Sequence, residues 1–149
     1  MLSQKAKYAL KALIALAEAA EGELLQAGEM AEAHNIPKKF LDLILLELRR
    51  HRLVDSRRGK KGGYLLMRPA HTMKIGDIVR VIDGPLAPIP CASVTAYRPC
   101  PDCGDTKACA VRKIMREVRD AAAGVLDNRT LADLAKAPRK PKTTRRLSA

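Results

Sequence analysis

The chain is 149 residues long and carries a net charge of +12. That length suits one ordinary domain and excludes a multidomain enzyme. The sequence contains no run of about twenty apolar residues, the length that a membrane-spanning helix needs. Residues 49–64 hold seven Lys and Arg against Asp55, and residues 136–149 hold six against no acid, so these stretches account for the whole excess. We expect a cytoplasmic protein that binds a polyanion and no membrane.

The N-terminal third predicts three helices. Ser3 can cap the first, which runs through QKAKYALKALIALAEAAE and ends at Gly22. A second, short helix fits GEMAEAHN, and after a tight connection Pro37 lies in the first turn of the third. The third helix has apolar side chains at helical spacing that must face a core: Phe40, Leu41, Ile44, Leu45 and Leu48.

A basic β-hairpin and a fourth helix follow. RLVDS and GYLLM are typical of short strands, and the glycine-rich segment RRGKKGG joins them. The predicted tip carries four cations, Arg57, Arg58, Lys60 and Lys61. Thr72 can then cap a helix that stops at Gly84 and whose apolar positions are Ile75, Ile78, Val79 and Ile82.

All four cysteines lie in one proline-rich loop: Cys91, Cys100, Cys103 and Cys109. Five prolines between residues 85 and 101 disfavour regular structure there. Reduced thiols in such a cluster indicate metal or redox chemistry rather than structural disulfides. A zinc site would usually have two CxxC pairs, and this loop has only one. A thiol–disulfide switch needs just two nearby cysteines. An iron–sulfur cluster takes four thiolates, which this loop could supply. The spacing alone leaves all three open.

A long helix is predicted from Cys109 onward. Its apolar residues step by three and four, which gives the seam of a dimerisation helix: Val111, Ile114, Val118, Ala121 and Val125. Packing against its own chain is the alternative. NRTLADL predicts a short capped helix, and the basic tail is expected to be disordered.

Short helix, tight turn, second helix and basic hairpin together predict a winged helix-turn-helix, in a fold that is mainly α with one small β-hairpin. The second helix would enter the major groove with Lys38, Lys39 and Asp42 leading. Arg57 and Arg58 would meet a minor groove or the phosphate backbone. The alternative is a helical domain whose charged hairpin is only solvated.

With this order of elements, the chain resembles the IscR/NsrR-like family of iron–sulfur transcription regulators over about residues 1–135. The resemblance is carried by SQKAKYAL, LVDSRRGKKGGYLL, IGDIVRVIDG, the C-x5-C spacing and NRTLADL. It implies a homodimer that binds double-stranded DNA at a palindromic operator and controls genes of iron–sulfur assembly, iron supply, or nitrosative and redox stress. By position, it adds Phe40 to the recognition helix and Gly59, between Arg58 and Lys60, to the wing.

The resemblance also assigns the cysteine loop. Cys91, Cys103 and Cys109 match the family's three cluster ligands. Members often take a fourth ligand from a histidine three residues past the last cysteine, but this chain has Arg112 there. Other members take it from an acidic residue in the partner's first helix, but the first helix here begins SQKAKY and has no acid at that point. We therefore expect Cys100 to supply the fourth thiolate, to a two-iron or four-iron cluster.

The sequence thus predicts a DNA-binding domain over residues 1–84, a cluster-binding loop over 85–109, dimerisation and terminal helices over 110–135, and a tail over 136–149. The expected function is that of a repressor that senses iron–sulfur status, iron, nitric oxide or redox state. The alternatives are a regulator with zinc or a disulfide switch, and a metal-carrying assembly factor. No enzyme is expected, because no nucleophile–base pair occurs and the histidines are scattered, at His34, His51 and His71.

Overall fold

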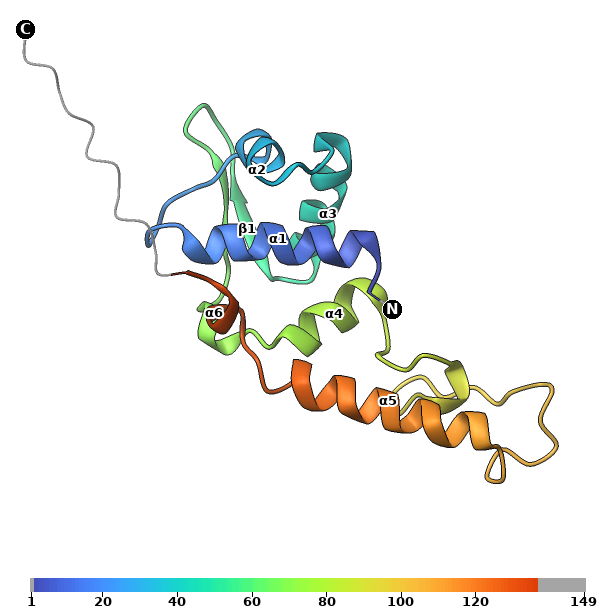
Figure 1. Ribbon diagram of the computed structural model, residues 1–149. Coiled ribbons are helices and arrows are strands. Elements are labelled where there is room, and N and C mark those ends of the chain that lie inside the picture. The colour runs from blue at the N-terminus through green and yellow to red at the C-terminus, as the bar shows by residue number, and fades with distance from the viewer. Residues whose placement is uncertain (1, 137–149) are drawn as a thin grey trace, which may run out of the picture.

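The computed structural model describes residues 2–136, so the expectation for the basic tail falls, apart from Lys136, outside the described residues. The elements in chain order are α1 (Gln4–Glu18), α2 (Ala27–His34), α3 (Lys38–Arg50), β1 (Val54–Arg57), β2 (Gly63–Leu66), α4 (Ile75–Asp83), α5 (Ala110–Leu126) and α6 (Leu131–Leu134). Two short 3-10 turns, η1 (Ala70–Thr72) and η2 (Pro90–Ala92), complete them. Figure 1 shows α1 to α4 and the hairpin gathered together, with α5 lying below α4.

The helix-turn-helix is built as the local sequence predicts, with small shifts in its bounds. The Ser3 hydroxyl caps α1 by accepting the backbone N–H of Ala6 at 3.0 Å. Asn35 closes α2 in the left-handed conformation, with φ at 52°. Pro37 stands just before α3 as its N-cap rather than inside its first turn. α1 ends at Glu18, before the predicted end at Gly22.

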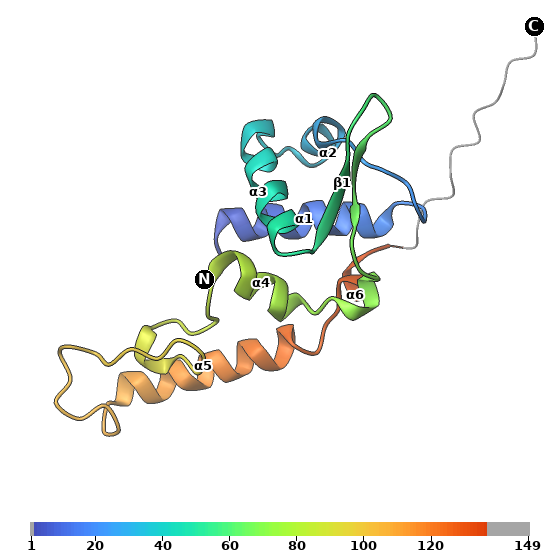
Figure 2. The ribbon, with the colours of Figure 1, turned by 180° about the vertical axis from the view of Figure 1, so that it is seen from behind.

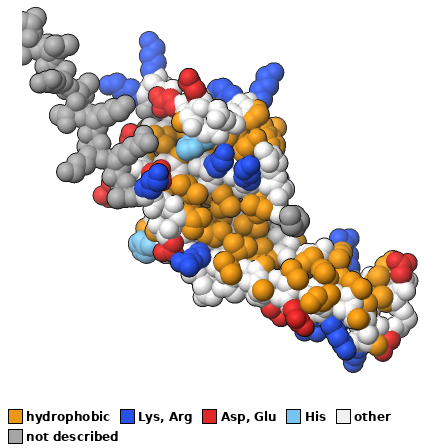
Figure 3. All heavy atoms as spheres, viewed as in Figure 1, with side chains coloured by type: hydrophobic (Ala, Val, Ile, Leu, Met, Phe, Trp, Pro, Cys, Tyr) orange, Lys and Arg blue, Asp and Glu red, His pale blue; other side chains and the backbone are white. Residues whose placement is uncertain are grey.

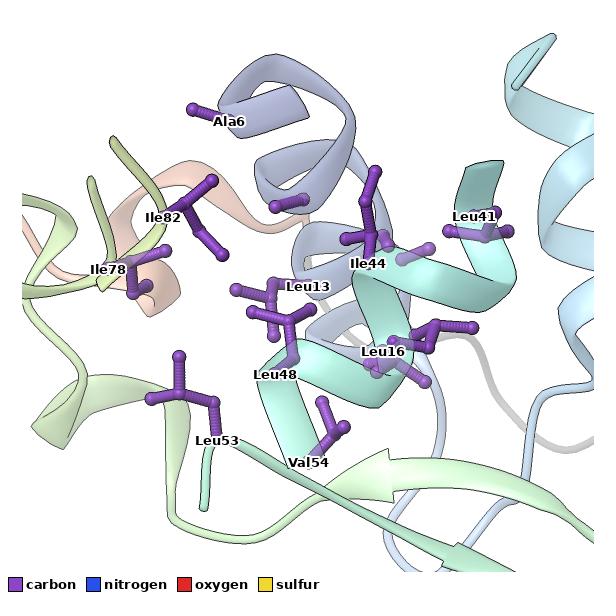
Figure 4. Close-up of a cluster of buried hydrophobic side chains, with 14 of the residues drawn as sticks. Ala6, Leu13, Leu16, Leu41, Ile44, Leu48, Leu53, Val54, Ile78 and Ile82 are labelled. Carbon is purple, nitrogen blue, oxygen red and sulfur yellow. The ribbon is translucent and has the colours of Figure 1, made fainter. Parts of the chain in front are cut away.

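One hydrophobic core holds α1, α3, α4 and β1 together (Figure 4). The buried face of α3 consists of the residues that its periodicity predicts: Leu41, Ile44, Leu45 and Leu48 are all fully buried. Leu13 and Leu16 of α1 point toward them, and Ile78 and Ile82 of α4 approach from the other side. Each side chain of this kind stabilises the fold by about 1.5–3 kcal/mol when buried. Because one whole face of α3 is held in the core in this way, the orientation of its opposite, solvent-facing side is fixed.

The start of α4 differs from the prediction. Thr72 lies in η1, where its hydroxyl donates to the carbonyl of Pro69 at 2.7 Å, and it does not cap α4. α4 begins at Ile75 with no side-chain cap. Its first backbone N–H donates instead to the carbonyl of Arg129 at 2.9 Å, so pairing with a distant segment replaces the cap.

The segment after α5 returns to the first domain. The Leu131 N–H donates to the carbonyl of Met73 at 2.8 Å, and the Leu131 side chain is fully buried in the core. Thr130 and Asp133 form a reciprocal capping box for α6, as NRTLADL predicts. The C-terminal end of α5 is therefore tied to the core through Leu131. Among residues 2–136, no helix is long and apolar enough to cross a membrane.

Candidate DNA interface and cysteine loop

The first turn of α3 presents its cations to solvent. Lys38 and Lys39 are exposed, and Lys38 forms an ion pair with Asp42 at 2.9 Å. Phe40 is half-buried, and its ring meets Tyr8 of α1 edge-on with centroids 5.7 Å apart. The Phe40 ring therefore holds α3 against α1, while its predicted place at DNA stays a prediction.

The hairpin follows the end of α3 and stands beside α2 as a wing (Figure 2). Its antiparallel register runs from Val54 opposite Leu66 to Arg57 opposite Gly63. Two backbone hydrogen bonds, of 3.0 and 2.8 Å, join Tyr64 to Leu25, just before α2. Because this pairing adds a third segment to a two-stranded ribbon, the wing is held in place next to the helix-turn-helix.

Two glycines make the wing possible. Gly59 adopts φ of 111°, a conformation that other residues rarely take. A Cβ on Gly62 would lie 2.2 Å from the carbonyl oxygen of Arg57. The turn is consequently tight, and it presents Arg57, Arg58 and Lys60 in exposed positions.

A basic hollow lies between the wing and the end of α3. Arg49, Arg57, Arg58 and Lys60 line it, and Gln26 closes one side by donating to the carbonyl of Lys60 at 3.3 Å. Guanidinium and ammonium groups around a concave surface attract phosphate. The structure therefore brings the predicted wing cations together with Arg49 and Gln26, which our sequence analysis did not select.

In the cysteine loop, three of the four thiols are neighbours. Hydrogen bonding to Cys100, and next to Cys109, raises the pKa of Cys103 to about 11. The backbone N–H of Arg112 donates to the Cys109 sulfur at 3.5 Å and lowers the pKa of that thiol. As they stand, no three His, Cys, Asp or Glu side chains within residues 2–136 form a metal-ligand group.

Cys91 lies apart, buried in η2. Arg112 connects Cys91 to the segment that holds the other cysteines. Its Nε donates to the carbonyl of Cys91 at 2.8 Å, and its Nη1 donates to the carbonyl of Thr106, between Cys103 and Cys109, at 3.5 Å. About two turns further along α5, Arg119 donates to the carbonyl of Ala92. Two arginines of α5 thus hold the carbonyls of Cys91 and Ala92, the last two residues of η2.

Comparison with known proteins gives the family. A model for Rrf2, described as an iron-dependent transcriptional regulator, matches residues 2–137. The chain belongs to the Rrf2 family. It is 46% identical over 137 residues to a protein of Rhodobacter capsulatus described as an rrf2-like HTH-type transcriptional regulator, covering 90% of this chain and 91% of that one.

Solved structures of Rrf2 regulators share this fold. CymR, the global cysteine regulator of B. subtilis, superposes with a TM-score of 0.73 at 33% identity, covering 91% of this chain and 95% of that one. IscR of T. potens gives a TM-score of 0.71 at 27% identity, covering 90% and 85%. The resemblance and the winged-helix fold class are confirmed. Rrf2 proteins are DNA-binding transcriptional regulators, typically dimeric, and not enzymes.

In this Rrf2 protein, α4 contacts both α1 and α5. Arg80 of α4 forms a bidentate ion pair with Asp127, at the end of α5, with distances of 2.7 and 2.8 Å. This pairing lowers the pKa of Asp127 and raises that of Arg80. In the same last turn of α4, both oxygens of Asp83 accept from Ser3, which caps α1. The sequence contained no local signal for either contact, since the partners are far apart in the chain.

α5 presents an uncovered apolar face. None of its residues is buried, and four of its five predicted seam residues are large hydrophobics left exposed: Val111, Ile114, Val118 and Val125. Figure 3 shows hydrophobic side chains gathered along α5 and over the region of α1 above it. A seam that finds no partner within the described chain is typical of a helix that pairs with another subunit.

Proposed function

We propose that this Rrf2 regulator is a homodimeric repressor whose cysteine loop holds an iron–sulfur cluster as its signal receptor. The ligands would be Cys91, Cys100, Cys103 and Cys109, and the operator would be palindromic. The observation that carries the proposal is the double attachment of α5. Its first half holds the cysteine loop through Arg112 and Arg119, and its end holds the DNA-binding domain through Asp127.

The residues present fit such a cluster by their chemistry. All four cysteines are free thiols, and thiolates are the ligands that iron–sulfur clusters take. The Arg112 backbone N–H and the N-terminus of α5 favour the thiolate form of Cys109. When bound, the cluster would supply a centre that reacts with oxidants or nitric oxide. Iron scarcity would leave this centre unassembled. Arg112 would keep Cys91 and Cys109 on the same side of α5.

A dimer would couple the loop to DNA. Pairing of the α5 seams would place two copies of α3 on one duplex, related by a two-fold axis, and this symmetry matches a palindrome. A change in the loop would shift α5, and through Arg80 and Asp127 would shift α4 and the spacing of the two α3 helices. The proposed sensing therefore needs only rigid-body motion.

The direct test is purification without oxygen, followed by a visible absorption spectrum and iron and sulfide assays on the same sample. We expect a coloured protein with equal iron and sulfide, two or four of each per chain according to the cluster type. A colourless protein with one zinc per chain would replace the cluster with a structural zinc site. A metal-free protein with a reversible disulfide would favour a thiol switch, for which the neighbouring thiols of Cys100, Cys103 and Cys109 are the candidates.

The same preparation distinguishes a regulator from an assembly factor. A regulator is expected to select one palindromic sequence from a random duplex library. Stoichiometric iron and sulfide without any DNA selectivity would favour a metal-carrying assembly factor instead.

A further inference from the structure

The outward face of α3 contains two leucines that the core does not explain. Leu43 is 64% exposed and Leu46 is 42% exposed, although α3 already buries four other hydrophobic residues on its opposite face. Solvent-facing positions of an amphipathic helix normally carry polar side chains. The two leucines therefore need a partner outside the described chain.

Helical spacing places the leucines in the middle of the face that carries the cations. Lys39, Leu43, Leu46 and Arg50 follow one another by four, three and four residues, so their side chains share one side of α3. Both terminal members of this stripe are exposed cations. The stripe is thus apolar at its centre and positive at both ends.

The nearby carboxylates are neutralised within the protein. Asp42 pairs with Lys38 at 2.9 Å, and Glu47 pairs with Lys5 of α1 at 3.0 Å. The wing and the end of α3 add the basic hollow lined by Arg49, Arg57 and Arg58. Such surroundings favour a polyanion and disfavour a second apolar protein surface, which would also need an area far larger than two side chains.

We propose that Leu43, supported by Leu46, reads thymine through its C5-methyl group in the major groove. The proposal rests on the proposed DNA-binding function and adds the chemical basis of its sequence selectivity. The thymine methyl is the apolar group on the major-groove edge, while the other positions there are hydrogen-bond donors and acceptors. Leu43 lies one turn inside α3 from Lys39, and the first turns of a recognition helix are those that reach bases.

Uracil tests this contact, because it pairs as thymine does and lacks only the methyl group. The full-length, cluster-loaded protein is used to select a consensus from a random duplex library. Thymines of that consensus duplex are then replaced singly by deoxyuridine, and affinities are measured at fixed salt. We expect at least one replacement in each half-site to weaken binding by about fourfold, the effect of one lost methyl contact.

The variants assign the effect to the residue. Leu43→Ala is expected to bind thymine and uracil duplexes equally at the sensitive position. Leu134→Ala, which shortens an exposed leucine on α6, is expected to keep the wild-type preference. Equal wild-type affinity for every uracil duplex, or an unchanged preference in Leu43→Ala, would overturn the inference alone. A library that yields no consensus would overturn the proposed function together with it.

Discussion

Two cations of the wing should contribute to DNA affinity through phosphate. Arg57 and Arg58 are exposed at the edge of the basic hollow, where they can each neutralise one phosphate. In the double variant Arg57→Ala/Arg58→Ala we expect weaker binding and a plot of log affinity against log salt that is shallower by about 3.6 for the dimer, because each of its two wings loses two phosphate contacts. The measurement is a salt titration by fluorescence anisotropy.

Arg129→Ala provides the matched control. Arg129 is also an exposed arginine, but it precedes α6, which lies away from the wing in Figure 1. Its salt slope should equal that of the wild type. A double wing variant with the wild-type slope would show that the wing does not contact phosphate.

Cys100 is proposed as the fourth cluster ligand because this sequence has no histidine at position 112. Arg112 stands at the position where the family resemblance implies a histidine ligand, and its guanidinium is occupied with the carbonyls of Cys91 and Thr106. We expect Cys100→Ala to lose the cluster's visible absorption and its iron, since only three thiolates would remain. Asp102→Ala, two residues further along the loop, should keep both. A Cys100→Ala protein that keeps the full iron content would assign the fourth ligand elsewhere.

At the scale of elements, η2 is fixed to α5 by side chains rather than by a core. Arg112 contacts the loop at three points, the Cys91 carbonyl in η2, the Thr106 carbonyl and the ring of Tyr97, whose centroid lies 5.8 Å from the guanidinium carbon. In metal-free Arg112→Ala we expect the amides of residues 91–109 to exchange hydrogen about tenfold faster, as loss of about one charge-assisted hydrogen bond implies. Hydrogen-exchange mass spectrometry measures this directly.

Arg116→Ala, one turn later on the same helix and exposed, is the control for that experiment. It should exchange like the wild type in this loop. If Arg112→Ala also leaves the exchange unchanged, the loop is held by something other than the arginine contacts.

α4 and the end of α5 fit together around a glycine. A Cβ on Gly76 would lie 1.9 Å from Oδ1 of Asp127 and would displace the carboxylate from Arg80. We expect Gly76→Ala to lower the free energy of unfolding by about 1–3 kcal/mol. Gly28→Ala, on the exposed side of α2 with only a Lys38 side-chain atom 3.9 Å away, should instead raise it by about 0.5 kcal/mol. Urea unfolding of both variants at one protein concentration makes the comparison, and equal stabilities would contradict the close packing.

The same ion pair should make the junction sensitive to acid. Hydrogen bonding from Arg80 holds the pKa of Asp127 below its ordinary value. The pair therefore contributes stability above the unfolded-state pKa, about 3.9, and loses it as pH falls through the lower folded-state pKa. We expect the advantage of the wild type over Asp127→Asn to be constant from pH 7 to 5 and to shrink as the pH falls below about 3.9. An advantage that persists at low pH would mean that charge is not its source.

At the scale of the whole molecule, the sequence predicted what depends on local pattern. The periodicity of α3, the glycines of the wing and the spacing of the α5 seam each show in a few consecutive residues, and the structure has these elements in that order. Thr72 was wrong as a cap because a local rule cannot anticipate pairing with Arg129. The contacts Arg80–Asp127 and Arg112–Cys91 were also not foreseen, because an arginine gives no sign of which distant oxygen it will meet.

The candidate site was predictable to a similar degree. Residue type and charge indicated the cations of α3 and the wing and the four cysteines, and the structure brings Cys100, Cys103 and Cys109 together while Cys91 is held apart in η2. The exposed leucines of α3 were passed over, since a leucine in a helix is usually assigned to the core. Counting the helical face from Lys39 would have revealed Leu43.

The proposed regulation depends on a coupling between the state of the cysteine loop and the affinity of the protein for DNA. Its most direct measurement titrates one operator duplex, chosen by selection, with cluster-loaded and cluster-free protein at the same salt and pH without oxygen. We predict that the two affinities differ by at least tenfold. The variant Asp127→Asn breaks the ion pair between α4 and the end of α5, so we expect it to reduce this difference in affinity while the cluster stays bound. Equal affinities of the loaded and cluster-free wild type would contradict the account.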